Sequence, residues 1–279
     1  MSTRNPARLA ASTARHTFLI IVAVAFVFPL VWIIISSFTP SGELTAEPLR
    51  VIPSASTLEH YRTVIVELGF LTNLRNSVFI SLTATAITIV LATLAAHGVV
   101  RFFPRVGERL TRILIATYMF PPILLAVPYA TIMIKLNLVD TYTSLILAYL
   151  SFTLPYAIWM LVGFYRTVPI EIEEAASVDG AGKLRTFLEI STPMVAPGIA
   201  ATAVYTFINC FNEFLYALLF ISSTDKMPVA VALYSITGAE VLDWGAMMAA
   251  SALVVVPSVL FFMSIQKYIA GGLTEGAGK

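Results

Sequence analysis

Glu213 is the most unusual ionisable residue of the sequence, because it lies deep inside a long apolar run. A charge at the centre of a bilayer costs about 2.5–3.5 kcal/mol on insertion scales, and such residues are usually functional. Glu213 follows Pro193 by 20 residues. That is about 30 Å of helix, which predicts a place near the outer end of a span. Asn212 precedes it, and Asn209 lies one turn earlier on the face predicted for Glu213.

Two interpretations of this polar group remain open. In the first, Asn209, Asn212 and Glu213 line an outer cavity or gate on a solute path. In the second, they form a hydrogen-bonded lock between neighbouring spans. Amide and carboxylate groups suit both roles, so the sequence does not decide between them.

The other residue types indicate no catalytic or metal site. The apolar runs contain no His/Asp/Ser triad and no cluster of metal ligands. The single cysteine, Cys210, is predicted to be a small packing residue. His97 is expected to pack or snorkel, and His60 to lie exposed in a loop.

A phosphate-binding loop is also absent from the sequence. Gly182-Lys183 and Gly278-Lys279 lack both the earlier glycine and the following Ser or Thr of such a loop. We therefore expect a protein that is not an enzyme, that holds no cofactor or metal, and that binds no ATP itself.

A long polar connection between two apolar runs is the most informative segment. The 27 residues from Arg166 to Thr192 hold five acids and three bases. A net charge of −2 favours insertion into a groove with basic walls on a partner protein. The alternative is a helix pair lying on the membrane surface, which would be rich in Lys and Arg.

Punctuating residues predict two short helices in this connection. Pro169 suits a first helical turn, and the acids that follow it lie near the positive end of the helix dipole. Asp179-Gly180 ends the first helix, since glycine readily adopts a left-handed cap. A second short helix is expected over 184–190, stopped by Pro193.

The composition requires a membrane protein. Of the 279 residues 58% are hydrophobic and 12% are charged, and the mean hydropathy is +0.86. Soluble domains carry about 25% charged residues. With a net charge of +1, these values exclude an ordinary cytosolic enzyme, a disordered chain and a nucleic-acid binder.

Six runs are long and apolar enough to cross a bilayer, which needs about 20 residues. They cover residues 18–36, 77–100, 113–134, 144–165, 195–221 and 245–266. We expect an all-α polytopic membrane protein with six transmembrane helices. Of 17 Lys and Arg residues, 12 fall in the two tails and the second and fourth connections. This excess predicts cytoplasmic termini and a cytoplasmic 166–193 connection.

Prolines interrupt five of the six runs. Each one removes a backbone donor and is expected to kink or break its helix. The third run, with Pro121-Pro122 and Pro128, is predicted to be a broken pair that ends in a turn at Asn137–Asp140. Broken helices favour a bundle that lines a cavity, because the freed backbone groups then face protein or water.

The polar connection also resembles a known motif. Glu174-Ala175-Ala176, Gly180 and the later Ile190-Ser-Thr-Pro193 are similar to the "EAA" loop of ABC-importer permeases, with Thr192 in place of the usual leucine. Asn76-Ser77, residues 211–214 and residues 266–277 match the carbohydrate-uptake branch, so the resemblance covers nearly the whole chain. It fits best the second, six-span permease subunit of maltose-type importers.

The resemblance implies a function in ATP-driven import of a sugar, oligosaccharide or polyol across a bacterial or archaeal plasma membrane. Partners would be a second permease subunit, two ATPase subunits that hold ATP and Mg, and an extracytoplasmic solute-binding protein. Permeation of another small solute such as glycerol phosphate, or ion-coupled secondary transport, is the alternative. The residues implied in ATPase coupling are Glu174, Ala175, Ala176, Asp179, Gly180, Ile190 and Pro193.

The same reading divides the chain into four parts. Residues 1–17 would be a cytoplasmic N-tail, and 18–76 the first transmembrane helix with an external loop. Residues 77–266 would form the core transmembrane domain, and 267–279 a cytoplasmic C-tail that reaches toward the ATPase subunits.

Overall fold

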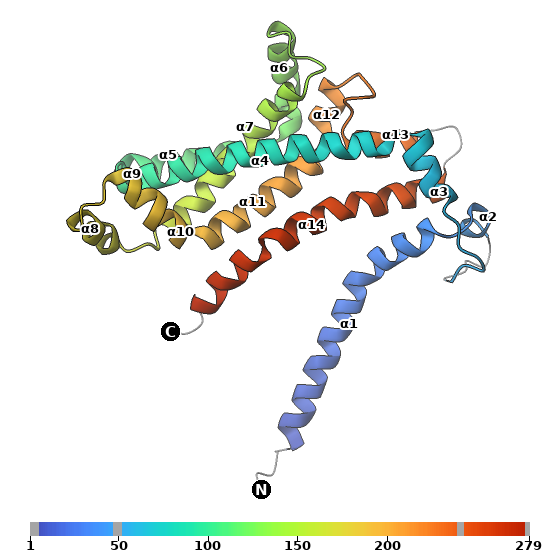
Figure 1. The fold of residues 1–279 in the computed structure, drawn as a ribbon, viewed down its shortest axis with the longest axis horizontal. Helices are drawn as coiled ribbons and strands as arrows, with labels where there is room; N and C mark the ends of the chain where they lie inside the picture. Colours follow the sequence, from blue (N-terminus) through green and yellow to red (C-terminus); the bar gives the residue numbers. More distant parts are fainter. Residues whose placement is uncertain (1–5, 47–51, 239–242, 277–279) are drawn as a thin grey trace. The chain divides into compact units, whose positions relative to one another are not determined.

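The computed structural model describes residues 6–46, 52–238 and 243–276, and every regular element within these ranges is a helix. The chain forms two compact units (Figure 1). The first contains Met1–Phe70 and Ser235–Val255, and the second contains Leu71–Tyr234 and Val256–Lys279. The expected all-α fold is confirmed.

Four helices of the described chain are long and apolar enough to span a membrane singly. They are α1 (Pro6–Ser37), α4 (Phe70–Arg101), α7 (Tyr142–Tyr165) and α14 (Trp244–Gly276). Two bent helix pairs raise the number to six if each pair is one span, which agrees with the prediction. The last candidate span, Trp244–Tyr268, lies close to the predicted 245–266, and helix α14 continues beyond it to Gly276. Residues 277–279 of the predicted tail lie outside the described residues.

The third span is broken, as its prolines predicted. Helix α5 (Pro104–Tyr118) and helix α6 (Pro122–Lys135) meet at an angle of 93°. Pro121 has extended backbone angles and Pro122 opens α6. Proline at the first position of a helix lacks only a donor that would be unpaired anyway, so the break occurs at little cost there.

The fifth span differs from the prediction of one helix over 195–221. Helix α11 (Ala196–Phe211) ends at Asn212, and a separate helix α12 (Leu215–Phe220) follows. The expectation that Pro197 interrupts this span is also wrong, because Pro197 lies in the first turn of α11. The chain bends instead just before it, by 74° between Met194 and Ala196.

The first unit contains a buried histidine. Here α1 is followed by α2 (Ser41–Leu44), α3 (Glu59–Arg62) and the π-helix η1 (Thr63–Glu67). The expectation of an exposed His60 is wrong, because its Nε2 lies 2.9 Å from the Thr39 carbonyl and only 3% of the residue is accessible. A Cβ at Gly245 would lie 2.0 Å from the His60 ring, so the ring needs a glycine opposite it.

The second unit packs around α7, which contacts α5, α11 and α12 (Figure 1). Small residues on α4 recur every four positions and are fully buried: Ala84, Thr88, Ala92 and Ala96. Such a stripe lets two helix backbones approach closely in a membrane. The Thr88 and Thr153 hydroxyls are 2.8 Å apart between α4 and α7.

Short helices complete this unit. Between α7 and α11 lie α8 (Ile170–Val178), α9 (Lys183–Thr186), the π-helix η2 (Phe187–Ser191) and α10 (Thr192–Met194). Helix α13 (Val229–Thr237) begins in the unit after α12. Cys210 is buried in an apolar cluster, as expected.

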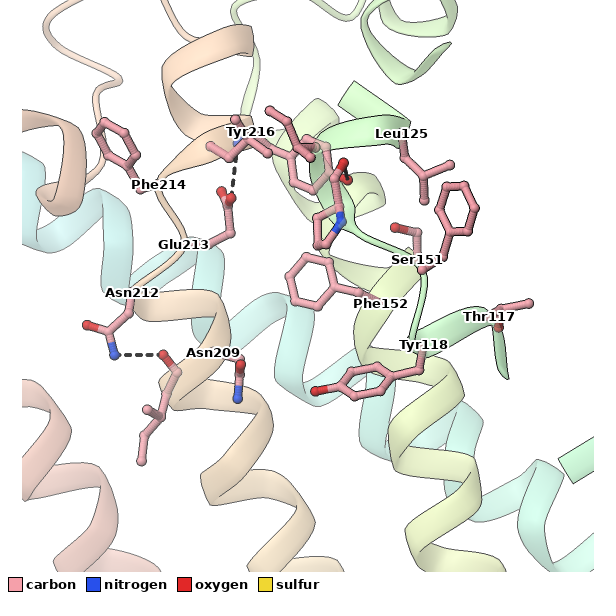
Figure 2. Close-up of a pocket in the computed structure, with 15 residues that line it drawn as sticks. Thr117, Tyr118, Leu125, Ser151, Phe152, Asn209, Asn212, Glu213, Phe214 and Tyr216 are labelled. Carbon is pink, nitrogen blue, oxygen red and sulfur yellow. Dashed lines mark hydrogen bonds between the residues drawn. The ribbon is translucent and has the colours of Figure 1, made fainter. Parts of the chain in front are cut away.

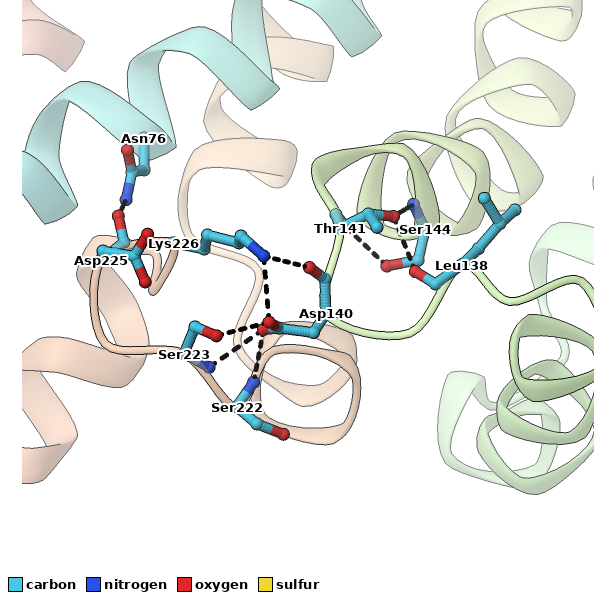
Figure 3. Close-up of polar contacts among 9 residues, drawn as sticks. All are labelled: Asn76, Leu138, Asp140, Thr141, Ser144, Ser222, Ser223, Asp225 and Lys226. Atoms are coloured by element: carbon cyan, nitrogen blue, oxygen red, sulfur yellow. Dashed lines mark hydrogen bonds and ion pairs between the residues drawn. The ribbon is translucent and has the colours of Figure 1, made fainter.

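A polar clasp joins the turn after α6 to the loop after α12. Asp140 has a positive φ of 60°, and its carboxylate accepts hydrogen bonds from the Ser223 hydroxyl and amide, the Ser222 amide and Lys226 (Figure 3). These bonds hold the pKa of Asp140 well below its ordinary value. The bond from the Ser223 hydroxyl has the largest effect, followed by those from the Ser223 amide, the Ser222 amide and Lys226.

We predict that Asp140→Asn lowers the midpoint of thermal unfolding of the detergent-solubilised protein by a few degrees at pH 7. Since the folded pKa is below the unfolded one, the carboxylate stabilises fully above its ordinary pKa of about 4 and loses its effect as the pH falls through the folded value. The difference in unfolding midpoint between the wild type and Asp140→Asn should therefore shrink only below about pH 4.

Asp225→Asn is the matched control in the same loop. Asp225 accepts the Asn76 amide through its backbone carbonyl, at 2.8 Å, which the substitution leaves intact. An equal loss of stability in both variants would contradict the role of Asp140.

Candidate functional site

The turn at Gly180 has the cap geometry that the sequence predicted. Gly180 has a φ of +88°. Its amide bonds the Ser177 carbonyl at 3.2 Å, and the Ala181 amide bonds the Ala176 carbonyl at 2.9 Å. These two bonds form a Schellman motif. They fix the direction in which the chain leaves α8.

The return segment differs from the prediction. Instead of one helix stopped by Pro193, it contains α9, η2 and α10, and Pro193 lies inside α10. A proline in a first turn continues a helix, and the bend occurs two residues later at Val195. The Tyr165 hydroxyl lies 3.0 Å from that of Thr192 and joins α7 to this segment.

An ion pair that sequence reasoning missed ties α8 to the end of α4. One oxygen of Glu173 accepts from Arg101 Nε at 2.9 Å, and the other from the Ser191 hydroxyl at 2.7 Å. Arg101 also donates to the Val168 carbonyl at 2.8 Å. The Arg101 and Glu173 side chains are 11% and 12% exposed, respectively. Such a shielded, hydrogen-bonded pair holds its elements together more strongly than a surface pair.

His97 packs beside this ion pair, as expected of a packing residue. Its ring contacts those of Phe102, Tyr165 and Phe187. The Nε2 atom has no hydrogen-bond partner, and it lies 3.9 Å from a Glu173 oxygen. A small cavity of about 190 Å³ opens here, with His97, Arg101 and Glu173 in its wall.

The opposite side of the loop is exposed. Of the residues predicted for coupling, Glu174, Ala175, Asp179, Gly180 and Pro193 are exposed, and Ile190 is half-buried. Ala176 is buried within this chain. Two apolar residues beside this face project outward, Val178 with 87% and Leu184 with 68% of its surface accessible.

A second site is a cavity of about 750 Å³ within the second unit (Figure 2). Its walls come from the last residues of α5 and α11, from the first residues of α6 and α12, and from the middle of α7. The breaks of the third and fifth spans therefore meet at one cavity. The Tyr216 hydroxyl joins them by donating to the Pro122 carbonyl at 3.1 Å.

Asn209, Asn212 and Glu213 all line this cavity, but not as one helical face. The prediction that Asn209 and Glu213 share a face is wrong, because α11 ends before Glu213. The Glu213 carboxylate instead caps α12, accepting from the amides of Tyr216 at 3.0 Å and Ala217 at 3.2 Å. A capping carboxylate also compensates the helix dipole.

The two asparagines are held by their own helix. The Asn209 amide donates to the Tyr205 carbonyl at 2.8 Å, and the Asn212 amide donates to the Ile208 carbonyl at 2.9 Å. Each side chain keeps its second N–H and its oxygen for other partners. Tyr205 also contacts the cavity wall, because its hydroxyl lies 2.5 Å from that of Tyr118.

Sequence reasoning missed the aromatic part of the wall. Tyr118, Phe152 and Tyr216 face the cavity from three different helices, together with Ser151 on α7 (Figure 2). No spacing in one segment connects residues so far apart. The only signal was the Pro121-Pro122 pair, which predicted an interrupted helix beside a cavity.

Metal binding has no support in the described part of the chain, where no three His, Cys, Asp or Glu side chains gather. The two sites are therefore an exposed acidic loop anchored to α4 and an aromatic cavity between broken helices.

Comparison with known proteins connects both sites to one family. A solved bacterial ABC transporter that imports the acidic polysaccharide alginate has the same fold, with a TM-score of 0.76 over 96% of this chain and 99% of that chain, at 17% identity. The trehalose/maltose permease protein of Thermococcus litoralis is 36% identical over 93% of this chain and 94% of its own length. The sulfoquinovosyl glycerol permease protein of Agrobacterium fabrum is 33% identical, over 93% and 91%.

A family model described as "binding-protein-dependent transport system inner membrane component" matches residues 88–275, which include both the 166–193 loop and the cavity. The resemblance noted in the sequence is confirmed. The chain belongs to this family of inner-membrane permease subunits of ABC importers.

Proposed function

We propose that this permease subunit carries a carbohydrate, and that its 166–193 loop couples the spans to an ATPase subunit. The carbohydrate is suggested by the relatives, whose names specify trehalose, maltose and sulfoquinovosyl glycerol, and by the alginate importer. The observation that carries the coupling role is the two-sided loop. One side is bonded to α4 through Glu173, and the other side exposes Glu174, Val178 and Leu184.

The exposed side has the properties of a docking surface. Val178 and Leu184 offer apolar area to a partner pocket, and Glu174 offers a charge to a basic wall. Gly180 sets the turn between them without a side chain. An ATPase subunit is the partner in this proposal, and it would hold the ATP and Mg.

The anchored side would transmit movement. A displacement of α8 would pull on Arg101 at the end of α4 and on Ser191 in η2, which leads through α10 into α11. The ends of α4 and α11 nearest the loop would then move together with α8. The Schellman turn and the Tyr165–Thr192 contact keep the loop stiff enough to do so.

The remaining assembly follows from the family. A second permease subunit would complete the pathway, two ATPase subunits would bind below it, and an external binding protein would deliver the solute. The excess of Lys and Arg supports cytoplasmic termini and a cytoplasmic loop. The four-part division at residues 17, 76 and 266 belongs to the same proposal, as does a solute path past Asn209, Asn212 and Glu213.

Uptake by host cells tests the function. Deletion of the gene should abolish uptake of a labelled saccharide such as trehalose or maltose, and the gene in trans should restore it. Uptake should stop when ATP is depleted and persist when ion gradients are collapsed. Loss with the gradients alone would indicate a secondary transporter, and uptake of glycerol 3-phosphate in place of sugars would indicate the other solute class.

We predict that Gly180→Val lowers uptake at least about fivefold while the amount of protein in the membrane is unchanged. A side chain at φ +88° strains the backbone by about 1–2 kcal/mol or more, which distorts the turn toward the ATPase. Co-purification of an ATPase subunit after mild detergent extraction should fall in parallel.

Gly182→Val is the matched control for this turn. Gly182 has an ordinary φ of −70° and, like Gly180, has no atom within 4 Å of the position of an added Cβ. Unchanged uptake in Gly180→Val, or an equal loss in both variants, would count against a role of the turn geometry.

We also predict that Glu173→Gln loosens the loop. Removing one member of a shielded pair leaves the other charge unpaired, so trypsin should cleave at Lys183 or Arg185 at least about tenfold faster in the purified protein. Glu171→Gln, at an exposed position of the same helix, should cleave like the wild type. Equal cleavage of the two variants would rule out Glu173 as the anchor.

A further inference from the structure

The aromatic cavity of about 750 Å³, here called the first cavity, has a smaller neighbour in the same unit. This second cavity has a volume of about 390 Å³, and Trp159, Gly163 and Arg166 at the end of α7 line it together with Thr111 of α5. Its volume suits a small molecule, to which Trp159 offers a flat apolar ring and Thr111 a hydroxyl group. Since the 166–193 loop begins at Arg166, the second cavity lies at the loop end of α7.

Both cavities lie along one face of α7. Phe152 lines the first cavity, whereas Trp159 and Gly163 line the second. With Tyr156 between them, these residues are spaced by four, three and four positions, which places them on the same side of a helix. Helix α5 borders both cavities as well. The two cavities therefore follow each other along α7, and the seven residues from Phe152 to Trp159 extend about 10 Å.

Three tyrosines lie between the two cavities. The ring of Tyr156 stacks on that of Tyr205 of α11, with centroids 4.0 Å apart, and its centroid lies 5.5 Å from that of Tyr118 of α5. The Tyr118 and Tyr205 hydroxyls are 2.5 Å apart, so a hydrogen bond joins α5 to α11 beside the Tyr156 ring. Tyr118 also lines the first cavity (Figure 2). All three side chains are half-buried, so they border open space and do not belong to the closed core.

We propose that the Tyr118–Tyr205 bond is a gate between two chambers of the solute path, and that the second cavity receives a saccharide after this gate opens. The inference rests on the proposed transport function and on the proposed cytoplasmic loop. A solute that leaves the first cavity toward the loop end of α7 meets the three tyrosine rings. A hydrogen bond between neutral hydroxyls contributes little net free energy, so a movement of α11 away from α5 can break it and form it again.

Helix α11 connects the gate to the loop. It begins at Ala196, directly after the bend that follows the loop, and Tyr205 lies in its third turn. A shift of α11 that starts at the loop would therefore reach the Tyr205 hydroxyl. Tyr118 would stay behind on α5, which packs against α7. The bond would break when the two helices separate.

Single cysteines measure the gate in the assembled transporter. Cys210 is the one cysteine of the chain, so Cys210→Ala gives a background to which Ser151→Cys in the first cavity or Gly163→Cys in the second is added. An added Cβ at Gly163 meets no atom within 4 Å. Inside-out membrane vesicles that contain all subunits and no nucleotide are treated with the membrane-impermeant reagent trimethylammonium-ethyl methanethiosulfonate.

We expect Gly163→Cys to react at least about tenfold faster than Ser151→Cys from this side, because the closed gate shields the first cavity. Tyr118→Phe keeps the ring and removes the bond, so the rate at Ser151→Cys should rise at least about fivefold, with less than about a twofold change at Gly163→Cys. Tyr205→Phe should have the same effect. Tyr129→Phe is the matched control, because within the described ranges the Tyr129 hydroxyl makes no hydrogen bond and lines neither cavity.

An unchanged rate at Ser151→Cys in both Phe variants of the gate would overturn the proposal, as would an equal rise with Tyr129→Phe. Failure of the reagent to label Gly163→Cys would overturn it too, because the second cavity would then be closed to solutes.

Uptake shows whether the solute passes through the second cavity. Cells with Gly163→Cys are treated with the membrane-permeant reagent benzyl methanethiosulfonate, which attaches a bulky ring to the thiol. Uptake of labelled trehalose or maltose should fall at least about fivefold, because the adduct fills part of a small cavity, and should return when dithiothreitol removes the adduct. The Cys210→Ala parent, treated in the same way, is the control for thiols of partner subunits.

Unchanged uptake in the modified Gly163→Cys cells would exclude the second cavity from the path. The labelling rates need no sugar. A lack of carbohydrate uptake before any modification would therefore refute the proposed function, while the rates would still confirm or refute the gate.

Discussion

A bilayer offers no water to backbone groups, so every N–H and C=O that a helix break exposes must find a partner inside the protein. This chain breaks two of its spans, near Pro121 and near Glu213, and both breaks are satisfied locally. The Glu213 carboxylate binds the first amides of α12, and the Tyr216 hydroxyl binds the carbonyl of Pro122. Because Tyr216 at the second break bonds the backbone at the first, the two breaks lie together, and the cavity forms where they meet.

The loop between α7 and α11 follows a related rule. A charge that is shielded from water needs a partner, and Glu173 has two, on α4 and on η2. The same contacts that satisfy this carboxylate connect α8 to the end of α4 and to the segment that leads into α11. In the proposed coupling, stability and force transmission would both depend on one ion pair, whereas the exposed side of α8 would be free to vary with its partner.

The two sites lie at opposite ends of the fifth span within the second unit. Helix α11 starts just after the loop at Ala196 and ends beside the cavity at Phe211. Sixteen residues of helix extend about 24 Å. One rigid element thus joins the surface that would receive work from an ATPase to the wall that would face the solute.

Much of this could be read from the sequence, because it depends on local patterns. Apolar runs of sufficient length determine the spans, paired prolines determine the break at Pro121, and Gly180 determines the left-handed cap. The order of residues from Glu174 to Pro193 was enough to identify the family. Only the tertiary structure decided which carboxylate of α8 turns inward, since neighbouring Glu173 and Glu174 differ in nothing but their direction. It also decided the aromatic wall, because side chains of α5, α7 and α12 can line one cavity only when these distant segments have been brought together.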